Sequence, residues 1–201
     1  MLKMRLQRGD TIIEVLLAVT VFSLVSVASM TIMNRSANAA QQAIETTLVR
    51  QQVDAQVEAL RAAHQAYSRL TTEEARDNSV WSSLKNTSTN SISTASGCPT
   101  QTALNTSQVF LMNPQTASIL TTATGAVLSM EADNAPVFAQ IIQDKASGIM
   151  TGYGLWIELH KVPGGFTPAA YDFRIRACWY GAGTGKTPMA LETTVRLYDV
   201  E

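Results

Sequence analysis

Few side chains in this sequence have the type and spacing that chemistry requires, and Glu14 is the most informative of them. It is the only charged residue between Thr11 and Met33, a stretch that also lacks Gly and Pro. A carboxylate inside a membrane helix costs roughly 2.5 to 3.5 kcal/mol on insertion scales, so it is rarely present without a partner. The alternative is that Glu14 lies near enough to the helix end to reach the lipid headgroups.

The histidines and cysteines do not form a pattern typical of a metal site. Two His and two Cys are scattered along the chain without a close-spaced pair, so a zinc site would need all four to converge. His64 falls on the apolar positions of a predicted helix, which favours a packed histidine. His160 follows a predicted strand and has no acid at metal-ligand spacing. We expect no metal and no cofactor.

The segment from Gly181 to Thr187 resembles a phosphate-binding loop but departs from it at two positions. Tyr180 stands where the motif requires its first Gly, and Pro188 blocks the helix that would hold the phosphate. A hairpin turn is the better interpretation. The sequence also lacks a Gly-x-Ser-x-Gly elbow and offers no base for a nucleophile, so we expect a protein that is not an enzyme.

Composition narrows the class of protein further. The 201 residues include 15 Lys and Arg and 16 Asp and Glu, a formal net charge of -1, which leaves no basic excess for nucleic-acid binding. Charged residues make up 15% of the chain, below the roughly 25% of typical soluble domains. This predicts one compact domain with an appendage that avoids water.

The apolar run supplies that appendage. From Thr11 to Met33 it would span about 35 Å as a helix, enough to cross a bilayer. Lys3, Arg5 and Arg8 precede it, so the positive-inside bias places the N-terminus in the cytoplasm. A cleaved secretory signal is the alternative, but its apolar region is typically about 7 to 15 residues long and carries no carboxylate.

The residues from Gly9 to Val19 read Gly-Asp-Thr-Ile-Ile-Glu-Val-Leu-Leu-Ala-Val, and this stretch resembles the N-terminal signal of type IV pilins and pseudopilins. The resemblance implies a cleaved leader, residues 1–9, with cleavage between Gly9 and Asp10 and Glu14 as the fifth mature residue. Many members have an apolar first residue, which the same peptidase N-methylates, whereas this chain has Asp10. Many members also carry Gly and Pro within the apolar helix, and this chain has hydroxyl residues there.

The role of Glu14 can also be argued from charge alone. Cleavage after Gly9 creates a new ammonium group at Asp10, and a charge at membrane depth needs an opposite charge nearby. Glu14 can supply it either to its own chain or to a neighbouring subunit, in which case the pair sets the register between helices. The carboxylate of Asp10 competes for the same amine.

The chain has no Gly or Pro between Gly9 and Gly97, which predicts a helix from Thr11 to about Leu70. Residues 10–34 are its membrane or filament-core half, and residues 35–75 are an amphipathic half. We expect one face of the second half to pack on a globular head. The predicted apolar face consists of Ile44, Leu48, Val53, Val57, Leu60 and Tyr67. The predicted polar face carries Gln42, Glu45, Arg50, Asp54, Glu58 and Arg61.

The remainder of the chain predicts a β-rich head, residues 108–201, preceded by a polar loop rich in Ser, Thr and Asn, residues 76–107. Short β-type runs cover residues 108–112, 118–122, 126–130, 153–162, 171–180 and 188–200. The last three alternate and are separated by Gly/Pro-rich turns, as in an antiparallel meander. Residues 137–143 fit either a strand or two helical turns. The fold class is therefore α+β, with a long spine helix packed on an antiparallel sheet in a pilin-like arrangement.

Cys98 and Cys178 both follow the membrane segment, so we expect them to form one disulfide. Closing a loop of about 80 residues is worth some 4 kcal/mol in the chain-entropy model. In the best-known pilins a disulfide closes a shorter loop.

The resemblance implies a structural subunit of a type IV pilus, major or minor, serving adhesion, motility or DNA uptake. Its partners would be other pilin subunits, a prepilin peptidase, and an assembly platform with its ATPase. The chain would be a single-pass membrane protein before assembly and part of an extracellular filament afterwards. Two alternatives remain open: a pseudopilin of a secretion or competence machine, and a permanently membrane-anchored adhesin or receptor module.

Overall fold

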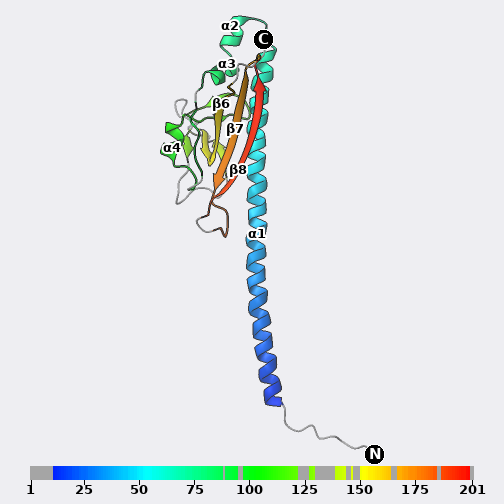
Figure 1. Ribbon diagram of the computed structural model, residues 1–201. Helices are drawn as coiled ribbons and strands as arrows, with labels where there is room; N and C mark the ends of the chain where they lie inside the picture. Colours follow the sequence, from blue (N-terminus) through cyan, green and yellow to red (C-terminus); the bar gives the residue numbers. More distant parts are fainter. Residues whose placement is uncertain are drawn as a thin grey trace, which may run out of the picture. The chain divides into compact units, whose positions relative to one another are not determined.

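A computed structural model describes residues 11–87, 89–94, 97–121, 127–129, 139–143, 146, 150–163, 167–184 and 187–199. The chain divides into two compact units, Met1–Gln41 and Gln42–Glu201. One helix, α1 (Thr11–Ser68), runs through both of them (Figure 1). The helix is present from Thr11, the first described residue, and ends two residues before the predicted end at Leu70.

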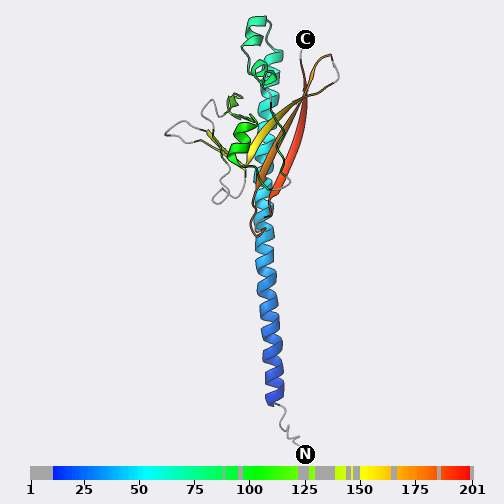
Figure 2. The same ribbon diagram turned by 60° about the vertical axis from the view of Figure 1, so that its left-hand side comes forward.

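The main sheet of the second unit consists of β6 (Leu155–Lys161), β7 (Ala170–Trp179) and β8 (Met189–Tyr198). The strands are antiparallel in the order β6-β7-β8, as the alternating sequence runs predicted. Figure 2 shows this sheet beside the later part of α1. Phe173 and Ile175 of β7 are fully buried, as are Val49 and Leu60 of α1, and all four belong to one hydrophobic core.

Trp81 occupies the centre of this core and is fully buried. Its ring lies 4.7 Å from that of His64 and 6.4 Å from that of Tyr67, both on α1, measured between centroids. On the sheet side, it lies 5.9 Å from Tyr171 and 5.7 Å from Phe173. Edge and tilted contacts at these distances are favourable for aromatic rings, so Trp81 joins the helix to the sheet.

The buried face of α1 differs from the predicted one at its beginning. Ile44 and Leu48 were expected on the packed face but are 61% and 36% exposed, whereas Glu45 was expected in solvent and is 2% exposed. The reason is the turn after β7, whose backbone needs polar partners. The Ala182 N–H donates to the Glu45 carboxylate at 3.3 Å, and Gln42 Nε2 donates to the Ala182 carbonyl at 2.7 Å.

The predicted polar loop, residues 76–107, is not wholly irregular, because it contains two short helices, α3 (Val80–Lys85) and α4 (Gln101–Thr106). A third short helix, α2 (Glu73–Asp77), ends at the start of this segment. Ser79 caps α3 by accepting from the Ser82 N–H, and Thr100 caps α4 by accepting from the Ala103 N–H. Two of the hydroxyl residues that resembled loop composition are thus helix caps.

The head is also not a single antiparallel sheet, because the described residues form three separate sheets. One pairs β1 (Leu111–Met112) with β2 (Ile119–Leu120), antiparallel and shorter than the predicted runs. In the other, β5 (Met150–Tyr153) lies between β3 (Val127–Ser129) and β4 (Gln140–Gln143). The pairing of β3 with β5 is parallel, which the long connection between them permits.

Gln56 of α1 pairs with the backbone of β1 as a strand residue would. Its Nε2 donates to the Met112 carbonyl at 3.0 Å, and its Oε1 accepts from the Met112 N–H at 2.7 Å. Gln56 and Met112 are both fully buried. A buried backbone group without a partner costs about 1 to 3 kcal/mol, so this one amide allows β1 to lie against the helix.

Gln56→Leu should therefore lower the free energy of unfolding by about 2 to 4 kcal/mol, because both Met112 groups lose their partner. Urea unfolding of the full chain in nonionic detergent, followed by the fluorescence of its three tryptophans, measures this. Gln51→Leu makes the same change on the exposed side of the helix and should shift stability by less than about 0.5 kcal/mol. Equal effects of the two substitutions would contradict the pairing argument.

Candidate functional site

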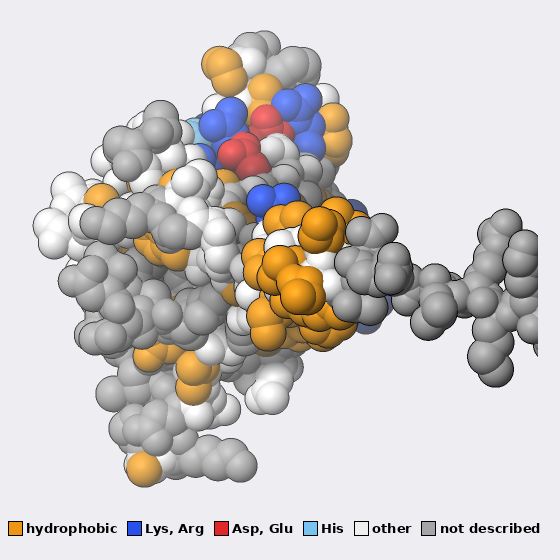
Figure 3. Space-filling view, turned by 90° about the horizontal axis from the view of Figure 1, so that it is seen from below, with side chains coloured by type: hydrophobic (Ala, Val, Ile, Leu, Met, Phe, Trp, Pro, Cys, Tyr) orange, Lys and Arg blue, Asp and Glu red, His pale blue; other side chains and the backbone are white. Residues whose placement is uncertain are grey.

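The first unit presents an apolar helical surface. Its large hydrophobic side chains are between 52% and 75% exposed from Ile12 to Met33. They are Ile12, Ile13, Val15, Leu16, Leu17, Val19, Val21, Phe22, Leu24, Val25, Val27, Met30, Ile32 and Met33. Figure 3 shows hydrophobic side chains gathered around the described end of this helix. Soluble monomers rarely expose a surface of this extent, which is typical of membrane or subunit contact.

Four hydroxyl residues of this segment donate to carbonyl groups of the same helix. Ser23 donates to the Val19 carbonyl at 2.8 Å, and Thr31 donates to the Val27 carbonyl at 3.0 Å. Thr20 and Ser26 make the same kind of bond. These groups can enter an apolar environment without external partners.

Glu14 differs from these hydroxyls because it is charged and lies in the first turn of α1. An acidic side chain there interacts favourably with the partial positive charge of the helix N-terminus. It remains the only charged side chain along this part of the surface, as the sequence indicated.

Among the described residues, α1 is the one helix long and apolar enough to span a membrane, with a mean hydropathy of 2.3 over its most apolar window. The chain therefore carries one candidate membrane-spanning helix near its N-terminus. Gly9 and Asp10, the predicted cleavage junction, lie outside the described residues.

The other residues singled out in the sequence make contacts that stabilise the fold. Cys98 and Cys178 form the expected disulfide across 80 residues of sequence. His64 packs as predicted, with Nε2 2.7 Å from the Tyr198 carbonyl oxygen. The segment after Tyr180 connects β7 to β8, as predicted for a hairpin turn, although residues 185 and 186 lie outside the described part. The described residues contain no group of three or more His, Cys, Asp and Glu that could hold a metal.

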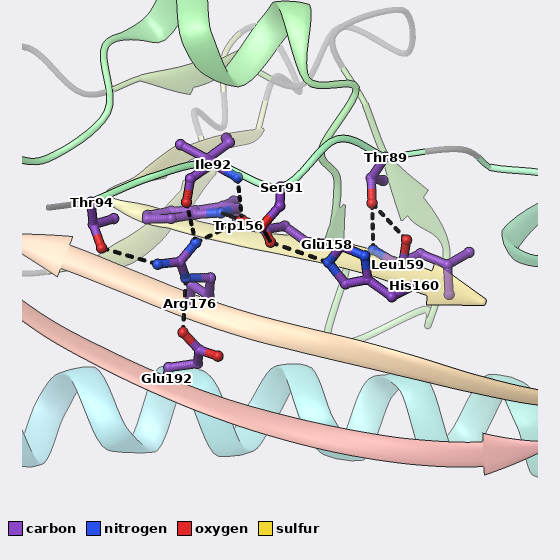
Figure 4. A network of polar contacts seen from close by, with 10 residues as sticks. All are labelled: Thr89, Ser91, Ile92, Thr94, Trp156, Glu158, Leu159, His160, Arg176 and Glu192. Carbon is purple, nitrogen blue, oxygen red and sulfur yellow. Dashed lines mark hydrogen bonds and ion pairs between the residues drawn. The ribbon is translucent and has the colours of Figure 1, made fainter. Parts of the chain in front are cut away.

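An extensive polar site among the described residues of the second unit surrounds Glu158 of β6 (Figure 4). Its side chain is fully buried and accepts from Trp156 Nε1 at 2.9 Å, from the Ile92 N–H at 3.2 Å and from the Ser91 hydroxyl at 3.1 Å. Arg176 Nη1 lies 3.0 Å from the same carboxylate, and His160 Nε2 lies 3.4 Å from it. A buried carboxylate is tolerable only with partners of this kind.

These contacts hold the carboxylate in its charged form. Burial by itself would raise the pKa of Glu158, but the bonds from Trp156, Arg176 and Ile92 outweigh it and lower the pKa below its usual value of 4.5. Arg176 also bonds the Ile92 carbonyl and, at 3.0 Å, the Thr94 hydroxyl. The network therefore ties the segment that leads to Cys98 onto β6 and β7.

Sequence reasoning did not identify this network. Leu155 to Leu159 are buried on both faces of β6, because residues 89–94 cover the face that does not meet the core. The sequence did contain one relevant signal: Trp156 and Glu158 are two residues apart in a strand and therefore share one face of β6. Arg176 lies opposite Trp156 in the register of β6 and β7.

Comparison with known proteins adds no relative: no family model, curated protein or solved structure matches this chain. The candidate sites therefore rest on the chain's own geometry. Glu158, at the centre of the network, is fully buried and has contacts within the chain at both carboxylate oxygens. The apolar surface that carries Glu14 is exposed, and it is the candidate functional site.

The lowered pKa of Glu158 predicts a pH dependence with a defined sign. A carboxylate with a depressed folded pKa stabilises the protein above its usual value of 4.5, and this contribution is lost as the pH falls through the folded pKa. Glu158→Gln should cost about 3 to 5 kcal/mol at pH 6, because Arg176 then lacks its buried partner. The difference from wild type should shrink on acidification, as measured by urea unfolding from pH 6 to pH 3.

Glu58→Gln is the matched control, because Glu58 pairs with Arg61 at the surface, where the two side chains are 69% and 51% exposed. Its effect should stay below about 1 kcal/mol at every pH. A constant difference between wild type and Glu158→Gln across the pH range would show that ionisation of Glu158 is not the cause.

Proposed function

We propose that this chain is a structural subunit, a major or minor pilin, of a type IV pilus. The observation that carries the proposal is α1, whose first part is an exposed apolar helix with one carboxylate in its first turn. The sequence before it, with basic residues and then Gly9, supports the same proposal by its resemblance to a prepilin leader. The function of such a subunit is association rather than catalysis.

In this function the apolar segment moves from the lipid bilayer into the core of a filament. Before assembly it crosses the membrane with the N-terminus in the cytoplasm, and in the filament it packs against the same segments of neighbouring subunits. Lipid tails and apolar side chains are about equally hydrophobic, so the transfer has little net hydrophobic cost. The internally bonded hydroxyls of Ser23 and Thr31 suit both environments. Extraction would require a prepilin peptidase and an assembly platform driven by an ATPase.

Glu14 acts in this proposal as the countercharge for the amine that cleavage creates at Asp10. The partner amine belongs either to the same chain, one helical turn away, or to an adjacent subunit. In the second case the ion pair aligns an incoming subunit axially.

A permanently membrane-anchored adhesin or receptor module is the second candidate, and the uninterrupted helix favours it. The described part of α1 shows no break between Thr11 and Ser68, and a plain anchor needs none. A pseudopilin of a secretion or competence machine would share the pilin chemistry. Processing separates the anchor from both pilin classes, because a plain anchor would retain residues 1–9.

The processing test is a mass measurement. Intact-mass analysis of membrane fractions should show the wild-type chain shortened by residues 1–9, and Gly9→Val should remain full length, since a β-branched side chain adds bulk beside the scissile bond. Identical N-termini in the two proteins would reject the pilin proposal and favour a plain anchor.

The assembly test targets Glu14. Glu14→Ala should leave the second unit folded and the chain processed, while filaments sheared from the surface fall sharply and processed monomer accumulates in the membrane. Val15→Ala trims a neighbouring side chain that is 60% exposed and keeps the carboxylate, so it should assemble normally. Asp10→Phe removes the local competitor for the amine. Incorporation of the Glu14→Ala chain at wild-type levels would eliminate the countercharge role.

A further inference from the structure

The outer edge of β8 is an open hydrogen-bonding surface from Ala190 to Arg196, beyond which the outward Tyr198 carbonyl accepts from His64 of α1. β8 is the terminal strand of its sheet, and Figure 2 shows it as the outermost strand on its side. Asp199 donates to the Ala169 carbonyl at 2.7 Å, so alternate residues pair with β7 and those between them point outward. Within the part of the chain that the structure describes, the outward N–H and C=O groups of Ala190, Glu192, Thr194 and Arg196 have no hydrogen-bond partner.

The opposite edge of the same sheet is closed by the chain itself. Ile157 of β6 exchanges backbone hydrogen bonds with Phe110 at 2.8 and 3.3 Å. The Leu159 N–H and carbonyl both bond the Thr89 hydroxyl, at 2.6 and 2.9 Å. Long open edges are unusual in soluble proteins because they pair with other chains, so the contrast marks β8 as a contact surface.

The charges along β8 indicate what this surface can bind. Glu192 lies 3.1 Å from Arg176 of β7, and Arg196 lies 2.7 Å from Asp172 of β7. Each of these two cross-strand pairs has one positive and one negative side chain, and we call each pair a row. In the first row the negative charge is on β8, and in the second row the positive charge is on β8. A strand that continues both rows must offer a positive charge opposite Glu192 and a negative charge opposite Arg196. β8 itself has this pattern when read antiparallel.

We propose that the β8 edge binds β8 of a second copy of this chain, antiparallel, about a twofold axis at Thr194. Glu192 then lies opposite Arg196 of the second copy, and the reverse pair forms symmetrically. Each row then contains four side chains of alternating charge: Arg176 and Glu192 of one copy, followed by Arg196 and Asp172 of the other. The facing pairs Glu192–Arg196 and Thr194–Thr194 each exchange two backbone hydrogen bonds, whereas the outward Tyr198 carbonyl keeps its bond from His64. Pairing centred on Glu192 or on Arg196 would instead place like charges at the axis.

The geometry of the second unit determines which copies can meet in this way. The bond from Gln42 to Ala182, before β8, and the bond between His64 and Tyr198, at its end, show that β8 and this part of α1 run in the same direction. Antiparallel β8 strands therefore place residues 42–68 of the two copies in opposite directions. The contact goes beyond the proposed filament core and does not depend on it.

A cysteine at the axis tests the register directly. Two Thr194 residues would face each other with Cα atoms about 5.5 Å apart, within the range of a disulfide. The two native cysteines are already bonded to each other, so Thr194→Cys introduces a single free thiol. The full chain in nonionic detergent, after mild oxidation, should run mostly as a dimer on a non-reducing gel.

Ala190→Cys is the control, because Ala190 is exposed on the same edge but its two copies would lie about 27 Å apart along the paired strands. It should remain mostly monomeric. Equal dimer yields from the two variants would overturn the proposal. So would monomeric Thr194→Cys whose thiol reacts fully with a small alkylating reagent.

Charge reversal supplies the second test, in the Thr194→Cys background. Glu192→Arg and Arg196→Glu should each reduce the dimer yield at least fivefold, because every facing pair then has like charges. Mixing the two variants should restore the yield, since all facing pairs between them are opposite. Tryptophan fluorescence verifies that each variant is folded. A mixture that forms no more dimer than the separate variants would overturn the proposed pairing.

Discussion

Residues 42–68 of α1 and the sheet of β6, β7 and β8 bury their apolar side chains against each other, and the rest of the second unit is arranged around this contact. Trp81 inserts between them and contacts both His64 of the helix and Phe173 of the sheet. Once the helix covers this face, every backbone group brought beneath it must find a polar partner. That requirement explains why several polar side chains are buried in this unit.

The buried polar residues each satisfy a specific piece of backbone. Gln56 bonds Met112, Glu45 and Gln42 bond Ala182, and Glu158 receives the Ile92 N–H. Each contact joins segments far apart in the sequence, and each would be costly to leave half made. The Cys98–Cys178 disulfide and the Glu158 network also hold neighbouring parts of one segment on the sheet.

α1 itself serves two environments with one continuous backbone. Its first part has apolar side chains on its exposed surface and hydroxyls bonded within the helix, whereas its later part has one buried face and one charged face. A helix satisfies its own interior hydrogen bonds, so it can pass from one environment to the other without a change of conformation. This property makes α1 suited to membrane insertion and to helix association alike, and the proposed pilin function depends on it.

The sequence alone determined the features that depend on local composition. The absence of Gly and Pro predicted α1, the apolar run with Glu14 predicted a membrane-competent segment, and regular alternation predicted β6, β7 and β8. Two cysteines beyond that segment were enough to predict the disulfide. In each case the signal lies in neighbouring residues or in a very small number of possible partners.

Only the tertiary structure decided which face of α1 is buried and which charged residues leave solvent. Glu45 and Glu158 have the sequence appearance of surface residues, yet both are buried because distant backbone groups and Arg176 come to them. The parallel pairing of β3 with β5 and the open edge of β8 likewise depend on which strands become neighbours. Such partners are remote in sequence. Hydrophobic periodicity and secondary-structure propensity are properties of a short stretch of chain, so they do not indicate which distant segment will pack against it.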